Sequence, residues 1–186
     1  MSAHVEPIVT VDDLDLMPED GNRYEVIGGE LFVSRAPDFL HQIIVSNLIF
    51  SLKSYFVSNP LGSVVTTPGL IFSFIDGVIP DLVYVSHERR ESILQGGRLR
   101  AAPELVVEIV SPGAENVRRD RIAKRQLYAK NGVEEYWIVD LRAHSIEVYR
   151  LRDGLLDLVA ILTDEQRIET PLLPGWGTSA RELFAI

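Results

Sequence analysis

One acidic residue interrupts the most apolar stretch of the chain, and this stretch constrains the fold more than any other. Residues 104–110 read ELVVEIV, so Glu108 stands between Val107 and Ile109 in a near-continuous apolar run. Such a run is typical of a strand that is covered on both faces of a sheet. A buried, ionised carboxylate must find a cation, accept hydrogen bonds or take up a proton. We therefore expect Glu108 to be either a metal ligand or one half of a salt bridge to an arginine.

The rest of the chain alternates between strand-like and helix-like patterns. Apolar runs on both sides of Gly28-Gly29 predict a hairpin, and apolar residues recurring every three to four positions from Pro37 to Phe56 predict a helix. Further strands are expected at 63–67, 69–75, 82–85, 135–140, 145–151 and 155–162, with a turn at Asp76-Gly77 and a second long helix at 115–131. This alternation predicts one α/β domain, residues 1–186, with a mixed central β-sheet flanked by helices. Within it, residues 104–140 should form a crossover between parallel strands.

Composition narrows the classes of function. The chain has no cysteine, which excludes disulfides and thiolate metal sites. No apolar run approaches the roughly 18–20 residues that span a bilayer, and the first ten residues lack the pattern of a secretory signal. We therefore expect a cytoplasmic protein with no membrane partner.

The net charge of −9 bears on nucleic-acid binding. A protein whose main role is to grip duplex DNA usually presents a broad basic surface, whereas this chain has 27 acidic and 18 basic residues. Some basic residues do gather in one region: Arg98, Arg100, Arg118, Arg119, Arg121, Lys124, Arg125 and Lys130. This region is either a local contact for nucleic acid or simply a solvated helix face.

Two carboxylates besides Glu108 stand out beside apolar strands. Asp81 follows a proline and opens the strand expected at 82–85, and Glu25 lies in the first hairpin. Carboxylates of this kind suit Mg²⁺, which binds one or two of them together with waters and phosphate oxygens. A further acid, Asp140, ends the strand at 135–140 and is interpreted as a turn former.

The helix after Glu108 carries polar residues at regular spacing. Asp120, Lys124 and Tyr128 are spaced by four and therefore lie on one face. Asp120 and Lys124 form either a surface ion pair or part of the site, where the ammonium of Lys124 would stabilise charge on a reacting phosphate. Tyr128 serves either as a hydrogen-bond donor to the site or as packing.

Several of these stretches together resemble one known family. They are RYEVIGGEL (23–31), IPDLVYVS (79–86), APELVVEIVSP (102–112), RRDRIAKRQLYAKNGVEEYWIVD (118–140) and IEVYRL (146–151). In this order they resemble the Uma-type endonucleases, bacterial proteins with a restriction-endonuclease-like core, over roughly residues 10–180. The resemblance implies a PD-(D/E)-x-K type of site, in which Asp81 and Glu108 hold one or two divalent ions, Mg²⁺ or Mn²⁺. Glu25 would be a further metal ligand.

The sequence departs from the wider superfamily at one position. The lysine expected two residues after Glu108 is Val110. The resemblance implies that Lys124 has taken over its role, although a missing lysine is equally what a degenerate nuclease would show. His41 stands where the family often has histidine, and it either contacts substrate or the metal site or is a polar helix-start residue.

Three functions remain open at this point. The first is a Mg²⁺-dependent endonuclease that hydrolyses nucleic acid, DNA in preference to RNA, with a homodimer as one arrangement. The second is a catalytically degenerate binding or regulatory module on the same fold. The third is a hydrolase of a small phosphorylated molecule.

Overall fold

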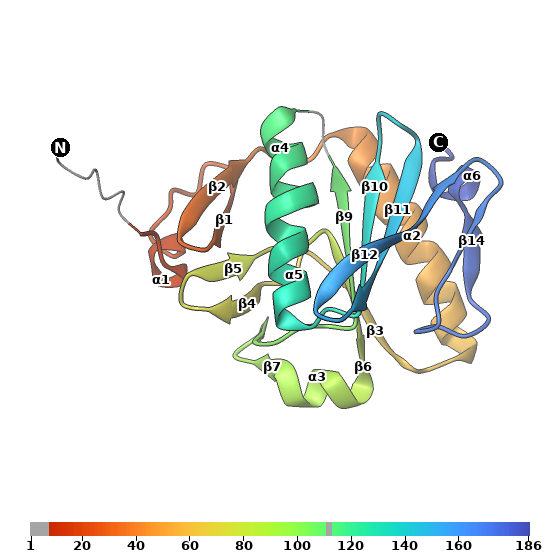
Figure 1. Ribbon diagram of the computed structural model, residues 1–186, viewed down its shortest axis with the longest axis horizontal. Coiled ribbons are helices and arrows are strands. Elements are labelled where there is room, and N and C mark those ends of the chain that lie inside the picture. Colours follow the sequence, from red (N-terminus) through yellow and green to blue (C-terminus); the bar gives the residue numbers. More distant parts are fainter. Residues whose placement is uncertain (1–7, 111–112) are drawn as a thin grey trace.

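In the described part of the chain, two six-stranded sheets and one two-stranded sheet form the framework (Figure 1). The computed structural model describes residues 8–110 and 113–186. The central sheet has the order β12 (Leu155–Thr163), β11 (Ser145–Arg152), β10 (Glu135–Asp140), β9 (Leu105–Val110), β6 (Leu82–Ser86) and β3 (Gly62–Thr66). The second sheet has the order β2 (Glu30–Ser34), β1 (Arg23–Ile27), β5 (Asp76–Val78), β4 (Leu70–Ser73), β8 (Arg98–Leu99) and β7 (Leu94–Gln95). The two-stranded sheet pairs β13 (Arg167–Glu169) with β14 (Gly177–Ser179).

Helices flank these sheets. They are α1 (Val11–Leu14), α2 (Phe39–Ser58), α3 (His87–Ile93), α4 (Ala114–Arg118), η1 (Arg119–Lys124), α5 (Arg125–Asn131) and α6 (Ala180–Leu183). Segments α4, η1 and α5 follow one another as a single crossover between β9 and β10, which pair in parallel. The α5 helix ends at Gly132, whose φ of 84° lies in the left-handed region that glycine adopts without strain. None of the helices in residues 8–110 and 113–186 is long and apolar enough to cross a bilayer.

The central sheet is buried on both faces, which explains its apolar strands. In β9, Val107 and Ile109 pack on the side of α2, while Val106 and Val110 pack on the side of α5. Figure 1 shows α2 and the α4–α5 crossover on opposite sides of this sheet. Because successive side chains alternate between the two faces, Glu108 points into the layer beneath the crossover helix. The expected α/β fold, with a mixed sheet and flanking helices, is confirmed.

The structure also corrects the sequence analysis in two places. Asp76 and Gly77 do not form a turn but belong to β5, and the turn lies at residues 74–75. The Asp76 carboxylate is buried and accepts hydrogen bonds from the Gly28 amide at 2.8 Å and the Ser73 hydroxyl at 2.8 Å. Tertiary contacts to the first hairpin therefore override the local turn preference. The second correction concerns residues 172–184, whose sequence predicts a loop followed by a short helix: β14 lies within the part expected to be loop, and it pairs with β13 before the helix α6.

Candidate active site

The antiparallel pairing of β6 with β9 brings two of the expected site residues together. Leu82 lies opposite Val107, and continuing this register by one residue places Asp81 opposite Glu108. The Asp81 carboxylate also accepts a hydrogen bond from the Ile109 amide at 2.8 Å. Both carboxylates are almost fully buried. Two acids that are 27 positions apart in sequence (108 − 81) are therefore neighbours at the end of one strand pair.

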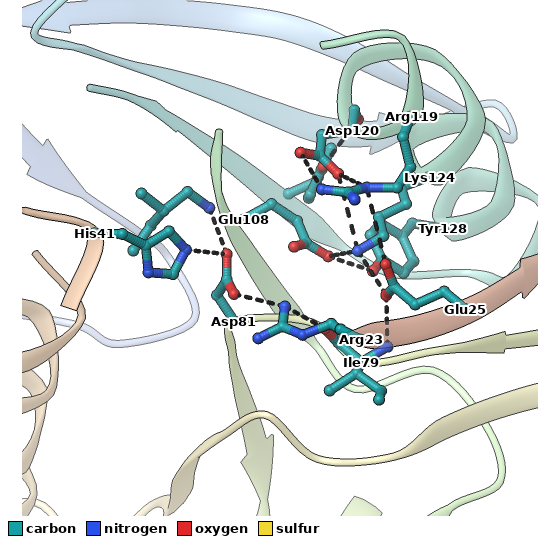
Figure 2. Close-up of polar contacts among 12 residues, drawn as sticks. Arg23, Glu25, His41, Ile79, Asp81, Glu108, Arg119, Asp120, Lys124 and Tyr128 are labelled. Carbon is teal, nitrogen blue, oxygen red and sulfur yellow. Dashed lines mark hydrogen bonds and ion pairs between the residues drawn. The ribbon is translucent and has the colours of Figure 1, made fainter. Parts of the chain in front are cut away.

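The crossover helix supplies a cation to this pair. The ammonium of Lys124 lies 2.9 Å from Glu108 Oε1 and 2.8 Å from Glu25 Oε1, and its side chain is fully buried (Figure 2). Lys124 ends η1, a π-helical segment that interrupts the α-helix. Such wider turns are frequent at functional sites. The lysine from the following helix thus reaches the acid of β9, as the resemblance implied.

Glu25 belongs to the same cluster, on strand β1. Its Oε1 also accepts a hydrogen bond from the Ile79 amide at 2.7 Å. Its Oε2 is buried and has no hydrogen-bond partner among the described residues, although Arg119 Nε lies 3.8 Å away. The hairpin therefore contributes a third carboxylate with one oxygen still able to accept a ligand.

Asp120 and Tyr128 complete the crossover's contribution. Asp120 is buried and accepts two hydrogen bonds from Arg119, at 2.7 and 3.0 Å, while Lys124 lies 3.9 Å from it. The interpretation of Asp120 and Lys124 as a surface ion pair is therefore wrong. The Tyr128 hydroxyl donates to Glu108 Oε1 at 2.8 Å and its ring packs in the core, so it is both a hydrogen-bond donor and a packing residue.

Asp81 has its own set of donors. His41 Nε2 lies 3.0 Å from Asp81 Oδ2, and Arg23 Nη1 donates to Asp81 Oδ1 at 2.9 Å. Arg23 also donates to the Ile79 carbonyl at 3.1 Å. His41 opens α2, is buried, and its Nδ1 has no hydrogen-bond partner in the described parts of the chain. His41 is therefore buried against Asp81 and is not merely a solvent-facing polar residue at a helix start.

Burial and charge perturb the two central acids in opposite directions. Burial alone would raise the pKa of Asp81, but the hydrogen bond and charge of His41, the charge of Arg23 and the Ile109 amide together lower it well below its ordinary value. Burial raises the pKa of Glu108, and the charge of Asp81 and the other acids adds to this effect, which Lys124 only partly offsets. Glu108 is therefore the carboxylate of the pair that takes up a proton more readily.

The carboxylates around Lys124 favour its charged form. Burial by itself lowers the pKa of Lys124, but the charges of Glu108, Glu25 and Asp120 together raise it well above its ordinary value. Lys124 is therefore the buried cation between the hairpin and β9.

A pocket of about 370 Å³ opens beside Asp81. Its wall includes three arginines, Arg23, Arg35 and Arg119, together with His41 and two carboxylates, Asp38 and Asp81, so arginines outnumber carboxylates in it. Glu108 and Lys124 lie behind this wall rather than in it. Of the cluster's residues, Arg23, His41, Asp81 and Arg119 line the pocket.

The donors fit a divalent cation in kind. Mg²⁺ needs only one or two carboxylates, with waters and phosphate oxygens as its other ligands, and Asp81 and Glu108 are adjacent carboxylates. The free Oε2 of Glu25 is a further oxygen of the right type. Within residues 8–110 and 113–186, however, no three His, Asp or Glu residues are arranged around a common point to hold an ion. Arg23 and Lys124 supply the positive charge in this arrangement.

The remaining sequence candidates lie outside the cluster. Asp140 accepts hydrogen bonds from the amides of Arg142 and Ala143 at 2.9 Å each, as expected for a turn former. Much of the basic region is bound to acids of the chain itself. Arg118 pairs with Glu30, and Arg121 pairs with Asp140 and Glu147. These two arginines are therefore paired, although Arg118 lies on an exposed face.

Arg23 is the site residue that the sequence analysis missed. A signal was present, because Arg23 stands two positions before Glu25 in a strand, and such residues share one face of a sheet. The pairing of Arg23 with Asp81, 58 positions further along the chain, has no such signal in the sequence.

The protein belongs to the class of α/β proteins with a restriction-endonuclease-like fold. Its site combines acids on adjacent strands with a lysine from the crossover helix. A crystal structure described as a putative nuclease belonging to DUF820, from Anabaena variabilis, shares this fold. Its TM-score is 0.76, with 18% sequence identity, and the match covers 95% of this chain and 97% of that one. No curated protein matches the sequence. The family model described as "Uma2: Putative restriction endonuclease" matches residues 11–181, and the chain belongs to this family.

Proposed function

We propose that the protein is a divalent-cation-dependent endonuclease that hydrolyses phosphodiester bonds of nucleic acid. The observation that carries this proposal is the convergence of Asp81, Glu108 and Lys124 from β6, β9 and η1 beside a cationic pocket. Membership of a family described as a restriction endonuclease supports the same reaction class.

Each side chain has a role in this proposal. Asp81 and Glu108 would hold Mg²⁺ or Mn²⁺, with Glu25 as a further ligand, and a bound divalent cation lowers the pKa of a water molecule and neutralises phosphate charge. Lys124 would provide positive charge near the reacting phosphate and keep the two glutamates in place. His41 would orient Asp81 through its hydrogen bond, as Tyr128 does for Glu108.

The same pocket wall offers cations for the substrate backbone. Arg35 and Arg119 lie in it, and phosphate groups are the anions that arginines bind with a planar fork. Because few arginines are available there and the net charge is −9, affinity should weaken only modestly as salt rises.

A second candidate function is a binding or regulatory module that has lost catalysis. Val110 in place of the expected lysine and the pairing of both central acids with internal cations favour it. A third is hydrolysis of a small phosphorylated molecule, because a pocket of about 370 Å³ is of small-ligand size.

One set of assays separates these candidates. Supercoiled plasmid, single-stranded DNA, RNA and small phosphate esters are incubated with the protein in Mg²⁺, in Mn²⁺ and in a chelator. Asp81→Asn and Glu108→Gln should lower cleavage by about 100-fold or more, as loss of a group central to transition-state stabilisation does. Asp140→Asn, which removes an acid outside the cluster, should cleave like the unaltered protein.

The outcomes point to different functions. Cation binding without cleavage of any substrate would favour the binding module, and release of phosphate only from small esters would favour the third function. Cleavage that survives Asp81→Asn and Glu108→Gln would refute the assignment of the site. A preference for DNA over RNA, a homodimer, a single domain and a cytoplasmic location stay predictions.

A further inference from the structure

Arg23 is a cationic residue bound to Asp81, a carboxylate that the proposed function assigns to a divalent ion. Its guanidinium donates to Asp81 Oδ1 at 2.9 Å and to the Ile79 carbonyl at 3.1 Å. It is also close enough to Glu108 and Glu25 for their charges to act on it. Figure 2 shows the guanidinium beneath Asp81, on the side of Glu25. One internal cation is thus bound to one of the three carboxylates that the proposed function assigns to a divalent ion, and the charges of the other two act on it.

The charges of the cluster make this cation necessary in the absence of metal. The cluster has four carboxylates, on Glu25, Asp81, Glu108 and Asp120. Three cationic side chains face them, on Arg23, Arg119 and Lys124. Arg119 binds Asp120 through two hydrogen bonds, and Lys124 lies between the two glutamates. Apart from His41, Arg23 is therefore the cation that compensates Asp81.

Arg23 is also the member of the cluster best able to leave it. Its side chain is 19% exposed, whereas that of Asp81 is 4% exposed and that of Lys124 is fully buried. It lies in the wall between the cationic pocket and a second pocket of about 330 Å³. Glu19, which is exposed, lines this second pocket and offers a carboxylate for a displaced guanidinium, whereas Asp15 there already pairs with Arg98 at 3.2 Å.

We propose that Arg23 competes with the divalent cation for Asp81. Without the cation, the guanidinium binds Asp81, and cation binding displaces it towards the second pocket. This inference rests on the proposed function, because it concerns the ligands of the same site. It makes Arg23 a residue that lowers cation affinity while stabilising the cation-free protein. A structural arginine would have the opposite effect on affinity, because its loss would disorder the carboxylates.

The test is a calorimetric titration with Mn²⁺ of the unaltered protein, Arg23→Gln and Arg35→Gln. Arg35 lines the same pocket, is exposed, and makes no ion pair with any described residue, so it is the matched control. Replacing Arg23 should tighten Mn²⁺ binding by about 10- to 100-fold, the range expected when one charge-assisted hydrogen bond no longer competes. Arg35→Gln should change the affinity by less than about threefold.

Thermal unfolding gives a second measurement. Without metal, Arg23→Gln should melt at a lower temperature than the unaltered protein, and saturating Mn²⁺ should raise its melting temperature by the larger amount. Adding Glu108→Gln to Arg23→Gln should abolish the tighter binding. Mn²⁺ affinity that is unchanged or weaker in Arg23→Gln would overturn the proposal.

A measurement on the unaltered protein applies if Arg23→Gln does not fold. The arginine Nε–H signals are followed by NMR during a Mg²⁺ titration, with Arg23→Lys used to assign the signal of Arg23. The Arg23 signal should move as Mg²⁺ saturates the site, and a signal that stays in place during saturation contradicts displacement.

The same experiments keep this inference apart from the nuclease proposal. Absence of any Mn²⁺ binding, with or without Arg23, overturns the competition, whereas cleavage measured in Mg²⁺ and compared with cleavage in a chelator decides separately whether the protein is a cation-dependent nuclease. Cleavage that needs Mg²⁺, together with equal Mn²⁺ affinity in Arg23→Gln, would leave the nuclease proposal intact and remove this one.

Discussion

Replacing Lys124 by methionine is the sharpest probe of the buried cluster. Methionine nearly preserves the volume of the lysine stem but removes an ammonium that lies 2.8 Å from Glu25 and 2.9 Å from Glu108. Two charge-assisted hydrogen bonds at about 1.5–3 kcal/mol each amount to about 3–6 kcal/mol. Breaking a buried ion pair by removing one partner costs about 3–5 kcal/mol, which agrees. We expect Lys124→Met to lower the free energy of unfolding by about 3–5 kcal/mol at pH 7, which corresponds to a melting temperature lower by roughly 6–20 °C at this chain length.

The loss should depend on pH in one direction. The pKa of Glu108 is already raised by burial, and removing Lys124 takes away the charge that lowers it, so Glu108 will bind a proton more readily in the variant. The pKa of Glu108 in the unaltered protein is raised to about 8, so lowering the pH from roughly 10 to roughly 6 should shrink the difference in unfolding free energy between the variant and the unaltered protein.

Urea denaturation followed by circular dichroism measures this difference. Lys130 lies on the same crossover helix but is exposed, so Lys130→Met is the control and should stay within about 0.5 kcal/mol of the unaltered protein. The double variant Glu108→Gln/Lys124→Met should be less destabilised than the sum of the single variants, because both changes remove one interaction. A loss below about 1 kcal/mol in Lys124→Met, or a loss independent of pH, would refute the reasoning.

Three further predictions test separate features. Tyr128→Phe should cost about 1–2 kcal/mol in urea denaturation, because it removes one buried hydrogen bond and no packing volume. Because the pKa of Asp81 is lower in the folded protein than its ordinary 3.8, its stabilising contribution is present above pH 3.8 and is lost as the pH falls further. Unfolding free energy measured from pH 5 to pH 2.5 should accordingly fall more steeply for the unaltered protein than for Asp81→Asn. Gly62→Ala should lower the melting temperature by the equivalent of about 1–3 kcal/mol, because the new Cβ would overlap the Val85 carbonyl, whereas Gly69→Ala meets only a flexible side chain and should change little.

Much of the fold was predictable because its patterns are local. The periodicities of α2, the crossover helix and the strands of the central sheet depend on which faces are apolar, and the hairpin depends on two glycines of positive φ. The turn at Asp76 was wrong for a physical reason: its carboxylate binds the amide of Gly28, and no local pattern carries that information.

The candidate site was predictable in part. An acid within an apolar strand requires a partner, and the spacing of the crossover helix placed Lys124 on the correct face. The donors of Asp81 are Arg23 from β1, His41 from α2 and the Ile109 amide. The number of these donors follows from tertiary packing. The same packing buries Asp120 and Lys124, so the surface ion pair considered for them was wrong.

The origin of the cluster's side chains also determines when it forms during folding. Glu25 and Lys124 are 99 positions apart (124 − 25), and they meet only after β1 has docked and the β9–β10 crossover has closed. Before η1 has emerged from the ribosome, the exposed part of the growing chain contains Glu25, Asp81 and Glu108 but not Lys124. The cluster therefore cannot assemble before η1 has been synthesised, and a product truncated before η1 would contain the three acids without Lys124.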